Sequence, residues 1–238
     1  TPYIAGMNSN SWNKDNAVLY ANDLMKQAEW RADGDLKYIL IPGSTNSKGN
    51  IPGEDCGMGM DGIIHQYPAG YSALQCAIYS GPYPASMRGD YVLSGIPAGI
   101  TATIIPRTGL TVMTGLPAGS VGWTITAEYL SAYLGVKFSG TIPPEGLNAS
   151  MTCFKVGVSD GINPIVLADY AEQKVTRFMS GAGGNMDPRT VPFSTLWQGT
   201  GASTDSSSNL NPLQNRIDFC NATGTDLYIV IPDQADDS

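Results

Sequence analysis

The chain has one histidine, so any hydrolytic site built from a nucleophile, an imidazole and a carboxylate must use His65. Such a site also needs a serine or cysteine beside the imidazole. The segment Gly70–Leu74 lacks the second glycine of the turn that presents a nucleophilic serine in α/β hydrolases. His65 stands close to Ile63, Ile64 and Tyr67, which suits a histidine at the end of a strand. We therefore expect no nucleophilic active site.

Paired carboxylates could serve glycoside hydrolysis, but the five glutamates have neighbours that suggest no acid and base pair. The glycine cluster Gly57–Gly62 does not match the Gly-x-Gly-x-x-Gly spacing of dinucleotide-binding loops, because its third glycine comes one position early. We expect a chain without enzymatic activity, and a β-sandwich hydrolase is kept only as a third hypothesis.

Calcium is the only cofactor for which the sequence offers candidate ligands, since carboxylate and carbonyl oxygens suit that ion. Asp55 and Asp61 lie in a glycine-rich loop, and Asp233, Asp236 and Asp237 lie in the acidic final segment. Neither group has EF-hand spacing. We favour the interpretation that they are ordinary solvated turn aspartates, so the expectation is no cofactor, with calcium as the alternative.

The sharpest short motif is Arg88-Gly89-Asp90. On a tight turn this triplet presents a cation and a carboxylate, and integrins recognise it. A Gly-Asp pair before a strand is also ordinary hairpin chemistry. We keep the three residues as candidates for contact with a cell-surface receptor.

The cysteines are widely spaced and form no Cys-x-x-Cys pair, which argues against zinc and thioredoxin-like sites. They are Cys56, Cys76, Cys153 and Cys220. Disulfides and buried thiols both stay open, because four cysteines allow three pairings and free cysteine is often buried. Two glycosylation sequons, at Asn148 and Asn221, would matter only in a secretory compartment.

The composition favours a single β-rich domain. The chain of 238 residues holds 28 glycines and 16 prolines, with only 14% charged residues and a formal net charge of −8. The acidic balance and scattered cations disfavour direct binding of nucleic acid. No apolar run is long enough for a membrane helix. The chain begins at Thr1 without an initiator methionine, and we expect a mature end produced by cleavage.

Three copies of one turn phrase organise the middle of the chain: Pro68-Ala69-Gly70, Pro97-Ala98-Gly99 and Pro117-Ala118-Gly119. Proline and glycine both favour turns, and the runs that follow alternate apolar residues with threonine or serine. Short strands separated by turns about every ten residues indicate an antiparallel β-sandwich or barrel.

We expect two short flanking helices, at about 16–31 and 164–179, because apolar residues recur there at helical spacing. Residues 1–14 should form an extended arm, residues 15–232 one β-sandwich domain, and residues 233–238 an acidic tail.

In whole-chain character the segment 36–232 resembles the jelly-roll capsid proteins of icosahedral viruses. The shared features are short strands, one or two flanking helices, long loops at 43–62, 81–90 and 181–215, and extended termini. The resemblance implies a structural subunit of the virion that assembles with copies of itself or other capsid chains. It also implies that Arg88, Gly89 and Asp90 could touch a host receptor. The chain departs from many such proteins because it lacks an arginine-rich arm.

The alternative from another class is a secreted or surface β-sandwich that binds carbohydrate or acts as an adhesin. Aromatic loop residues and calcium-binding aspartates would carry that function. A monomer that binds sugars would favour this alternative over the shell subunit.

Overall fold

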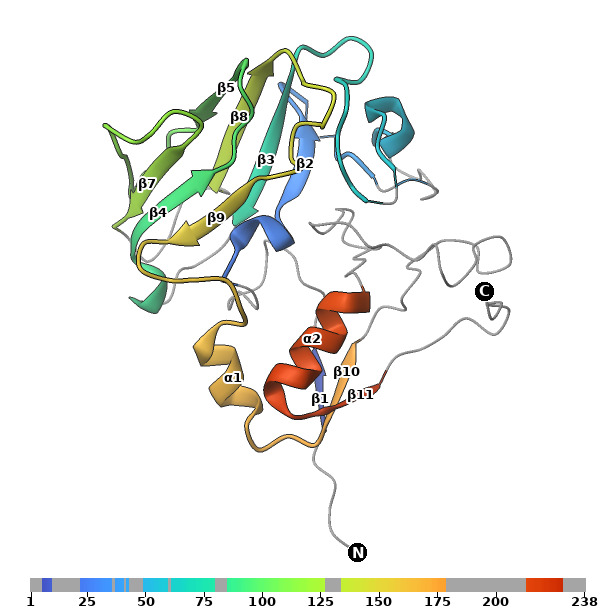
Figure 1. The fold of residues 1–238 in the computed structure, drawn as a ribbon, viewed down its shortest axis with the longest axis vertical. Helices are drawn as coiled ribbons and strands as arrows, with labels where there is room; N and C mark the ends of the chain where they lie inside the picture. Colours follow the sequence, from blue (N-terminus) through green and yellow to red (C-terminus); the bar gives the residue numbers. More distant parts are fainter. Residues whose placement is uncertain are drawn as a thin grey trace, which may run out of the picture.

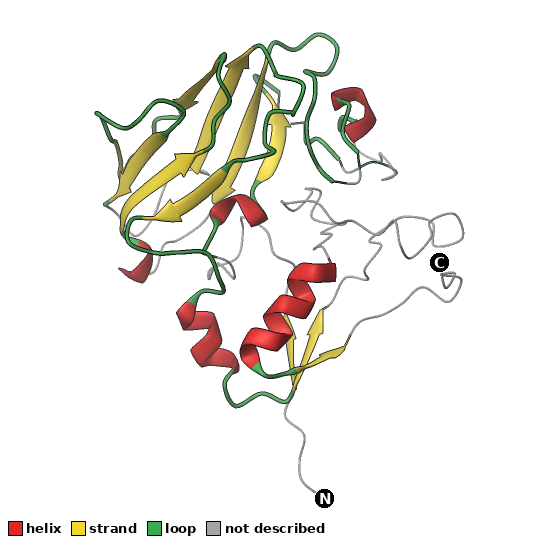
Figure 2. Ribbon diagram, in the orientation of Figure 1, coloured by secondary structure: helices red, strands yellow, loops and turns green. Residues whose placement is uncertain are grey.

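The computed structural model describes residues 6–9, 22–35, 37–40, 42, 49–59, 61–79, 85–126, 134–178 and 213–228. Within these ranges the chain is mainly β, with two antiparallel sheets of four strands and one parallel sheet of three (Figures 1 and 2). The predicted β-sandwich is therefore confirmed at the level of fold class. The predicted division into an arm, one domain and a tail stays a prediction.

The first antiparallel sheet has the order β2-β3-β8-β5 and the second has the order β6-β7-β4-β9. Their strands are β2 (Glu29–Ala32), β3 (Ala73–Tyr79), β4 (Gly89–Ser94), β5 (Ile100–Ile104), β6 (Leu110–Val112), β7 (Val121–Ile125), β8 (Leu134–Gly140) and β9 (Thr152–Lys155). The predicted alternating runs after Gly99 and Gly119 form β5 and β7, and all three Pro-Ala-Gly phrases form hydrogen-bonded turns. In each turn the N–H two residues beyond the alanine donates to the proline carbonyl, at 3.0 to 3.2 Å.

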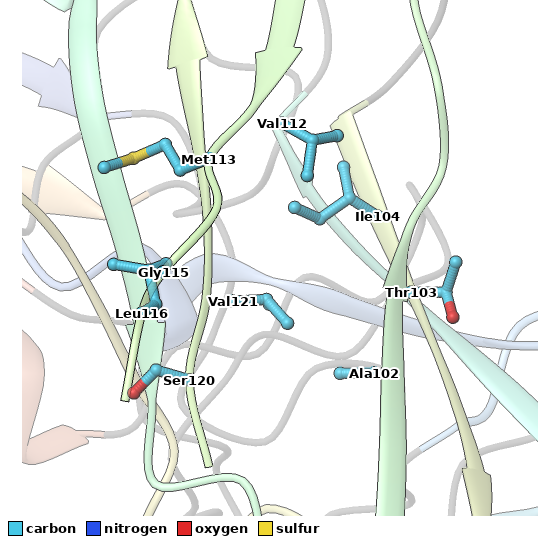
Figure 3. A pocket seen from close by; sticks show the side chains of 9 residues that line it. All are labelled: Ala102, Thr103, Ile104, Val112, Met113, Gly115, Leu116, Ser120 and Val121. Carbon is cyan, nitrogen blue, oxygen red and sulfur yellow. The ribbon is translucent and has the colours of Figure 1, made fainter. Parts of the chain in front are cut away.

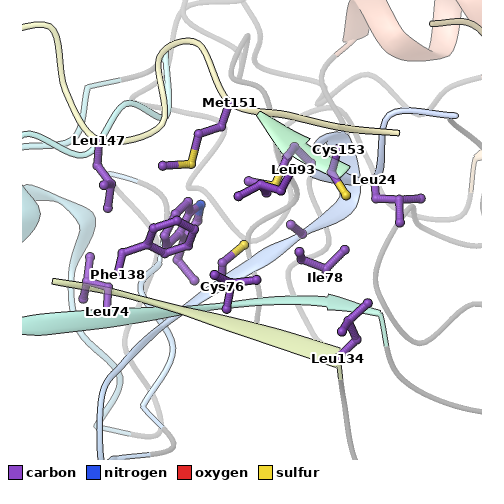
Figure 4. Packing of buried hydrophobic residues seen from close by; sticks show 14 of the residues in the cluster. Leu24, Leu74, Cys76, Ile78, Leu93, Leu134, Phe138, Leu147, Met151 and Cys153 are labelled. Atoms are coloured by element: carbon purple, nitrogen blue, oxygen red, sulfur yellow. The ribbon is translucent and has the colours of Figure 1, made fainter. Parts of the chain in front are cut away.

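One apolar core fills the space between the two antiparallel sheets (Figure 4). Trp123 and Phe138 are fully buried, and Trp123 stacks on its cross-strand neighbour Tyr91 with ring centroids 6.3 Å apart. Burying side chains of this size contributes roughly 1.5–3 kcal/mol each. The core holds the two sheets together and fixes the positions of the strands at their edges.

A second unit stands at the other end of the molecule in Figure 1, where β1 (Gly6–Ser9), β10 (Val175–Phe178) and β11 (Asp226–Tyr228) form a parallel sheet. The helices α1 (Pro164–Tyr170) and α2 (Leu213–Thr223) meet beside it through the edge-to-face contact of Tyr170 with Phe219 at 4.9 Å. All eight sandwich strands lie between β1 and β10 in sequence, so the sandwich is an insertion into this parallel unit.

The predicted helix at 16–31 is wrong over its described part. The 3-10 helix η1 (Leu24–Gln27) ends at its cap Ala28, and the strand β2 then begins, whose four residues are buried and paired with β3. Residues 16–21 lie outside the described ranges. Pairing with β3 outweighs the local helical spacing, because the strand also buries Trp30 in the core.

The second predicted helix begins at Pro164, as expected, but ends at Tyr170 instead of 179. Residues Val175–Phe178 form β10, which pairs in parallel with β1 and β11. These partners are more than 45 residues away in sequence, so no local pattern reports them. The helix α2 also lies partly in a stretch expected to be loop.

Candidate functional site

The only histidine of the chain, His65, contacts backbone carbonyl groups of neighbouring loops. The exposed His65 places Nδ1 3.1 Å from the carbonyl oxygen of Pro144, and its backbone N–H donates to the carbonyl of Cys56 at 3.0 Å. Among the described residues, the imidazole makes no hydrogen bond or ion pair with a serine, a cysteine thiol or a carboxylate. The geometry offers no hydrolytic triad in that part of the chain.

The candidate calcium ligands are not brought together where the structure describes them. Asp55 is exposed in the 3-10 helix η2 (Gly53–Cys56). The Asp61 carboxylate accepts the N–H of Ile63 at 3.1 Å, as turn aspartates commonly do. No group of three metal-ligating side chains occurs among the described residues. Asp233, Asp236 and Asp237 lie outside those residues, so the calcium prediction stays untested there.

The receptor-binding candidates lie at the start of a strand. Arg88 follows the 3-10 helix η3 (Ala85–Met87), and Gly89 and Asp90 are the first residues of β4. The Asp90 carboxylate accepts a hydrogen bond from the Thr124 hydroxyl on the neighbouring strand β7. Gly89 and Asp90 are therefore part of a strand ladder, and Arg88 lies directly before it. Receptor contact stays a prediction.

All four cysteines are buried and none forms a disulfide. Cys76 and Cys153 belong to the sandwich core, on β3 and β9 (Figure 4). Burial raises the pKa of the Cys56 thiol to about 12, and burial also raises the pKa values of the other three thiols. The cysteines are packing residues in the described structure.

The two sequons differ in accessibility. Asn148 is buried, and its amide donates to the carbonyl of Gly62 at 2.9 Å while its carbonyl accepts the N–H of Ile64, also at 2.9 Å. Asn221 is exposed on α2. The folded chain therefore has no room for a glycan on Asn148, and the same side chain fastens the end of the long glycine-rich loop.

The most distinctive surface of the sandwich is the side where β5 and β6 stand at the margins of their sheets. The other two margins are partly covered by the chain itself. Along β2, the N–H of Ile39 donates to the carbonyl of Trp30 at 3.0 Å. Beside β9, the buried carboxylate of Asp23 accepts the N–H of Cys153 at 2.9 Å. No described segment pairs with the outer side of β5 or β6.

A cavity of about 400 Å³ opens between β5 and the β6–β7 hairpin (Figure 3). Its apolar walls come from Ile104 on β5, Val112 on β6, Val121 on β7, and the connecting residues Met113 and Leu116. Val112 is 49% exposed, which makes it one of three large aliphatic side chains on the surface of the described residues. We call this surface, formed by β5, β6 and the cavity between them, the open edge.

The open edge is almost free of charge. Between Tyr91 and Thr126 the only charged residue is Arg107, in the turn between β5 and β6, although the whole chain carries −8. Threonines project on this side from the strands themselves, and Thr101, Thr103 and Thr111 are exposed. An uncharged surface with apolar walls suits contact with another macromolecule more than contact with an ionic substrate.

The open edge was not predicted from the sequence, although its strands were. The signal that could have pointed to it is the run of 35 uncharged residues broken only by Arg107. Comparisons of the chain with protein families, curated proteins and solved structures gave no match. No described helix is long and apolar enough to cross a membrane.

Proposed function

We propose that this protein is a structural subunit that assembles with copies of itself into a shell, in the manner of the jelly-roll capsid proteins. The single observation that carries the proposal is the order of the strands in the two sheets of the sandwich. A jelly roll is an eight-stranded sandwich made by rolling up a long antiparallel hairpin, so that strands distant in sequence become neighbours.

The sandwich strands β2 to β9 reproduce the inner part of that pattern. Numbered one to eight in sequence order, jelly-roll strands pair as 2-7, 7-4, 3-6 and 8-3, and the matching pairs here are β3-β8, β8-β5, β4-β7 and β9-β4. The two outer strands differ. β2 pairs with β3 in place of β9, and β6 pairs with β7 in place of β5. We interpret the sandwich as a jelly roll in which the two marginal strands, β2 and β6, pair with the strands that follow them in sequence.

The surface supports a role that depends on contact area. Large subunit interfaces work by shape and buried apolar surface, and they need no reactive side chain. The open edge supplies an uncharged apolar surface on a chain whose net charge of −8 would otherwise keep copies apart. This combination favours self-assembly over binding of a small charged ligand.

The test is the assembly state of the purified full chain. Electron microscopy over a range of salt concentration and pH should show closed particles of uniform size. A chain that stays monomeric under all of these conditions and binds glycans on an array would contradict the proposal and support the carbohydrate-binding alternative.

A further inference from the structure

We propose that the open edge is a self-association surface, where β5 and β6 of one copy lie against the same strands of a second copy. This inference rests on the proposed function and specifies which surface makes the contact. The partner is therefore a second copy of this chain, placed by a two-fold axis.

The backbone of β5 points hydrogen-bonding groups outward. The N–H of Ile105 donates to the carbonyl of Gly135 at 2.9 Å, and the N–H of Thr141 donates to the carbonyl of Gly99 at 3.2 Å. In the register of β5 with β8, the odd-numbered residues from 99 to 105 therefore form the hydrogen bonds between the two strands. Because antiparallel ladders alternate, the N–H and C=O groups of Ala102 face the outer side of the strand. A paired strand of a second copy would satisfy them.

The strand β6 repeats this arrangement. The N–H of Met113 donates to the carbonyl of Gly122 at 2.9 Å, and the N–H of Thr126 donates to the carbonyl of Gly109 at 2.9 Å. Val112 falls between hydrogen-bonded positions, opposite Trp123, and its backbone groups also face outward. Within the described residues, both sheets thus present strand margins without a paired neighbour on the same side of the sandwich.

Neither margin carries a charged residue or a proline within its strand, although the three-residue length of β6 itself limits pairing. Soluble proteins place lysine, proline or a bulge on such strands to prevent association. Here β5 reads Ile-Thr-Ala-Thr-Ile and β6 reads Leu-Thr-Val, with no charge and no proline in either strand. Threonine and β-branched residues favour cross-strand pairing. The unprotected margins indicate a surface that is covered in the native assembly.

The charge distribution favours another copy of this chain as the partner. A basic partner would select for carboxylates at its docking site. The chain has no aspartate or glutamate between Tyr91 and Thr126, and the one charged residue in this range is Arg107. Two chains of net charge −8 repel each other least where their surfaces are neutral. In a two-fold contact the same patch meets itself, so the apolar wall at Val112 would be sealed by its counterpart.

The test compares two substitutions of the same kind at valines of similar exposure. Val112→Glu places a carboxylate in the open edge, and Val156→Glu places one beyond β9, on the opposite margin of the same sheet. Val112 is 49% exposed and Val156 is 58% exposed, so neither change removes a core side chain. Circular dichroism and thermal unfolding establish that both variants fold.

Sedimentation velocity of the full chain should show association for the wild type and for Val156→Glu. The dissociation constant of Val112→Glu should rise by about 100-fold or more, because the interface would bury an unpaired charge. A backbone variant, Ala102→Pro, should weaken association in the same way while keeping the bonds to β8, since its N–H faces outward.

Three outcomes would overturn the inference in different ways. If Val112→Glu and Ala102→Pro associate like the wild type, another surface makes the contact, and the proposed self-assembly survives without this interface. If Val156→Glu weakens association as much as Val112→Glu, the added negative charge on the whole chain causes the weakening, and the open edge is not the interface. If the wild type stays monomeric at every concentration, both the inference and the proposed function fail.

Discussion

Replacing Asn148 with alanine should destabilise the sandwich, because this side chain joins two of its loops. The side chain makes two hydrogen bonds of 2.9 Å, one to the N–H of Ile64 and one to the carbonyl of Gly62. Asn148 is 4% exposed and Ile64 is fully buried, so water cannot replace the lost partners without opening the loop. The Asn148 amide therefore joins its own loop to the segment at Gly62 and Ile64, which lies 84 residues away in sequence at Ile64.

The magnitude follows from these contacts. Each buried group that loses its partner costs about 1–3 kcal/mol, so Asn148→Ala, which leaves two such groups unpaired, should lower the free energy of unfolding by about 2–6 kcal/mol. For a chain of this size, each kcal/mol corresponds to roughly 2–4 °C in Tm. Thermal unfolding followed by circular dichroism should therefore show a decrease in Tm of about 4–24 °C.

The matched control is Ser150→Ala, which removes the same sequon but leaves both hydrogen bonds of Asn148 in place. Its Tm should stay close to that of the wild type, because Ser150 is exposed. Expressed through a secretory pathway, the folded protein should carry no glycan on Asn148 by mass spectrometry. A decrease in the free energy of unfolding below about 1 kcal/mol for Asn148→Ala would show that these two hydrogen bonds do not stabilise the fold as argued.

Three further predictions follow from burial, backbone and charge. All four thiols should react slowly with a thiol reagent at pH 8 in the native state and completely in denaturant; fast native labelling would contradict their burial. Gly95→Ala should destabilise the fold by about 2 kcal/mol or more, and Gly115→Ala by about 1 kcal/mol. Both have φ of +76°, but a Cβ at Gly95 would lie 2.0 Å from the carbonyl oxygen of Ser150, whereas Gly115 has open space, so equal Tm values would refute the steric argument. Lys137 lowers the pKa of Asp33 by hydrogen bonding, so this pair stabilises the fold at neutral pH and the contribution is lost as pH falls through the lowered pKa. Asp33→Asn should therefore make the decrease of Tm with falling pH less steep in the acidic range. An unchanged pH dependence of Tm would contradict a stabilising role of the Asp33–Lys137 pair.

Local patterns were sufficient for the centre of the sandwich. The three Pro-Ala-Gly phrases produce turns, and in each the glycine adopts a φ between +76° and +86° that favours this residue. The strand β5 alternates in burial as its sequence suggests, with Thr101 and Thr103 exposed, because one face of its sheet is buried. Here turn chemistry and burial act within ten residues, which is the range that a sequence pattern reports.

The strand β2 shows why the pattern failed elsewhere. Glu29 and Arg31 are both buried, although charged residues rarely lie in cores without partners. The Arg31 guanidinium lies 3.7 Å from the Glu29 carboxylate, donates to the Tyr38 hydroxyl at 2.6 Å, and stacks 4.3 Å from the centre of that ring. These contacts stabilise a charged strand in the interior, and they exist only once the chain has folded.

The open edge was beyond the reach of sequence reasoning for a related reason. The residues of β5 and β6 read as ordinary strands, and nothing in Ile100–Ile104 or Leu110–Val112 tells which neighbour each strand takes. β6 pairs with β7 and leaves β5 without a second neighbour among the described residues. A free margin is a property of the sheet order, so only the fold could identify it.

The most direct test of self-assembly is the sedimentation coefficient of the wild-type chain, measured from low to high concentration in one buffer. We predict a shift from a small species to a larger assembly of defined size, which Val112→Glu prevents. A single species of about 25.1 kDa at every concentration would contradict the account.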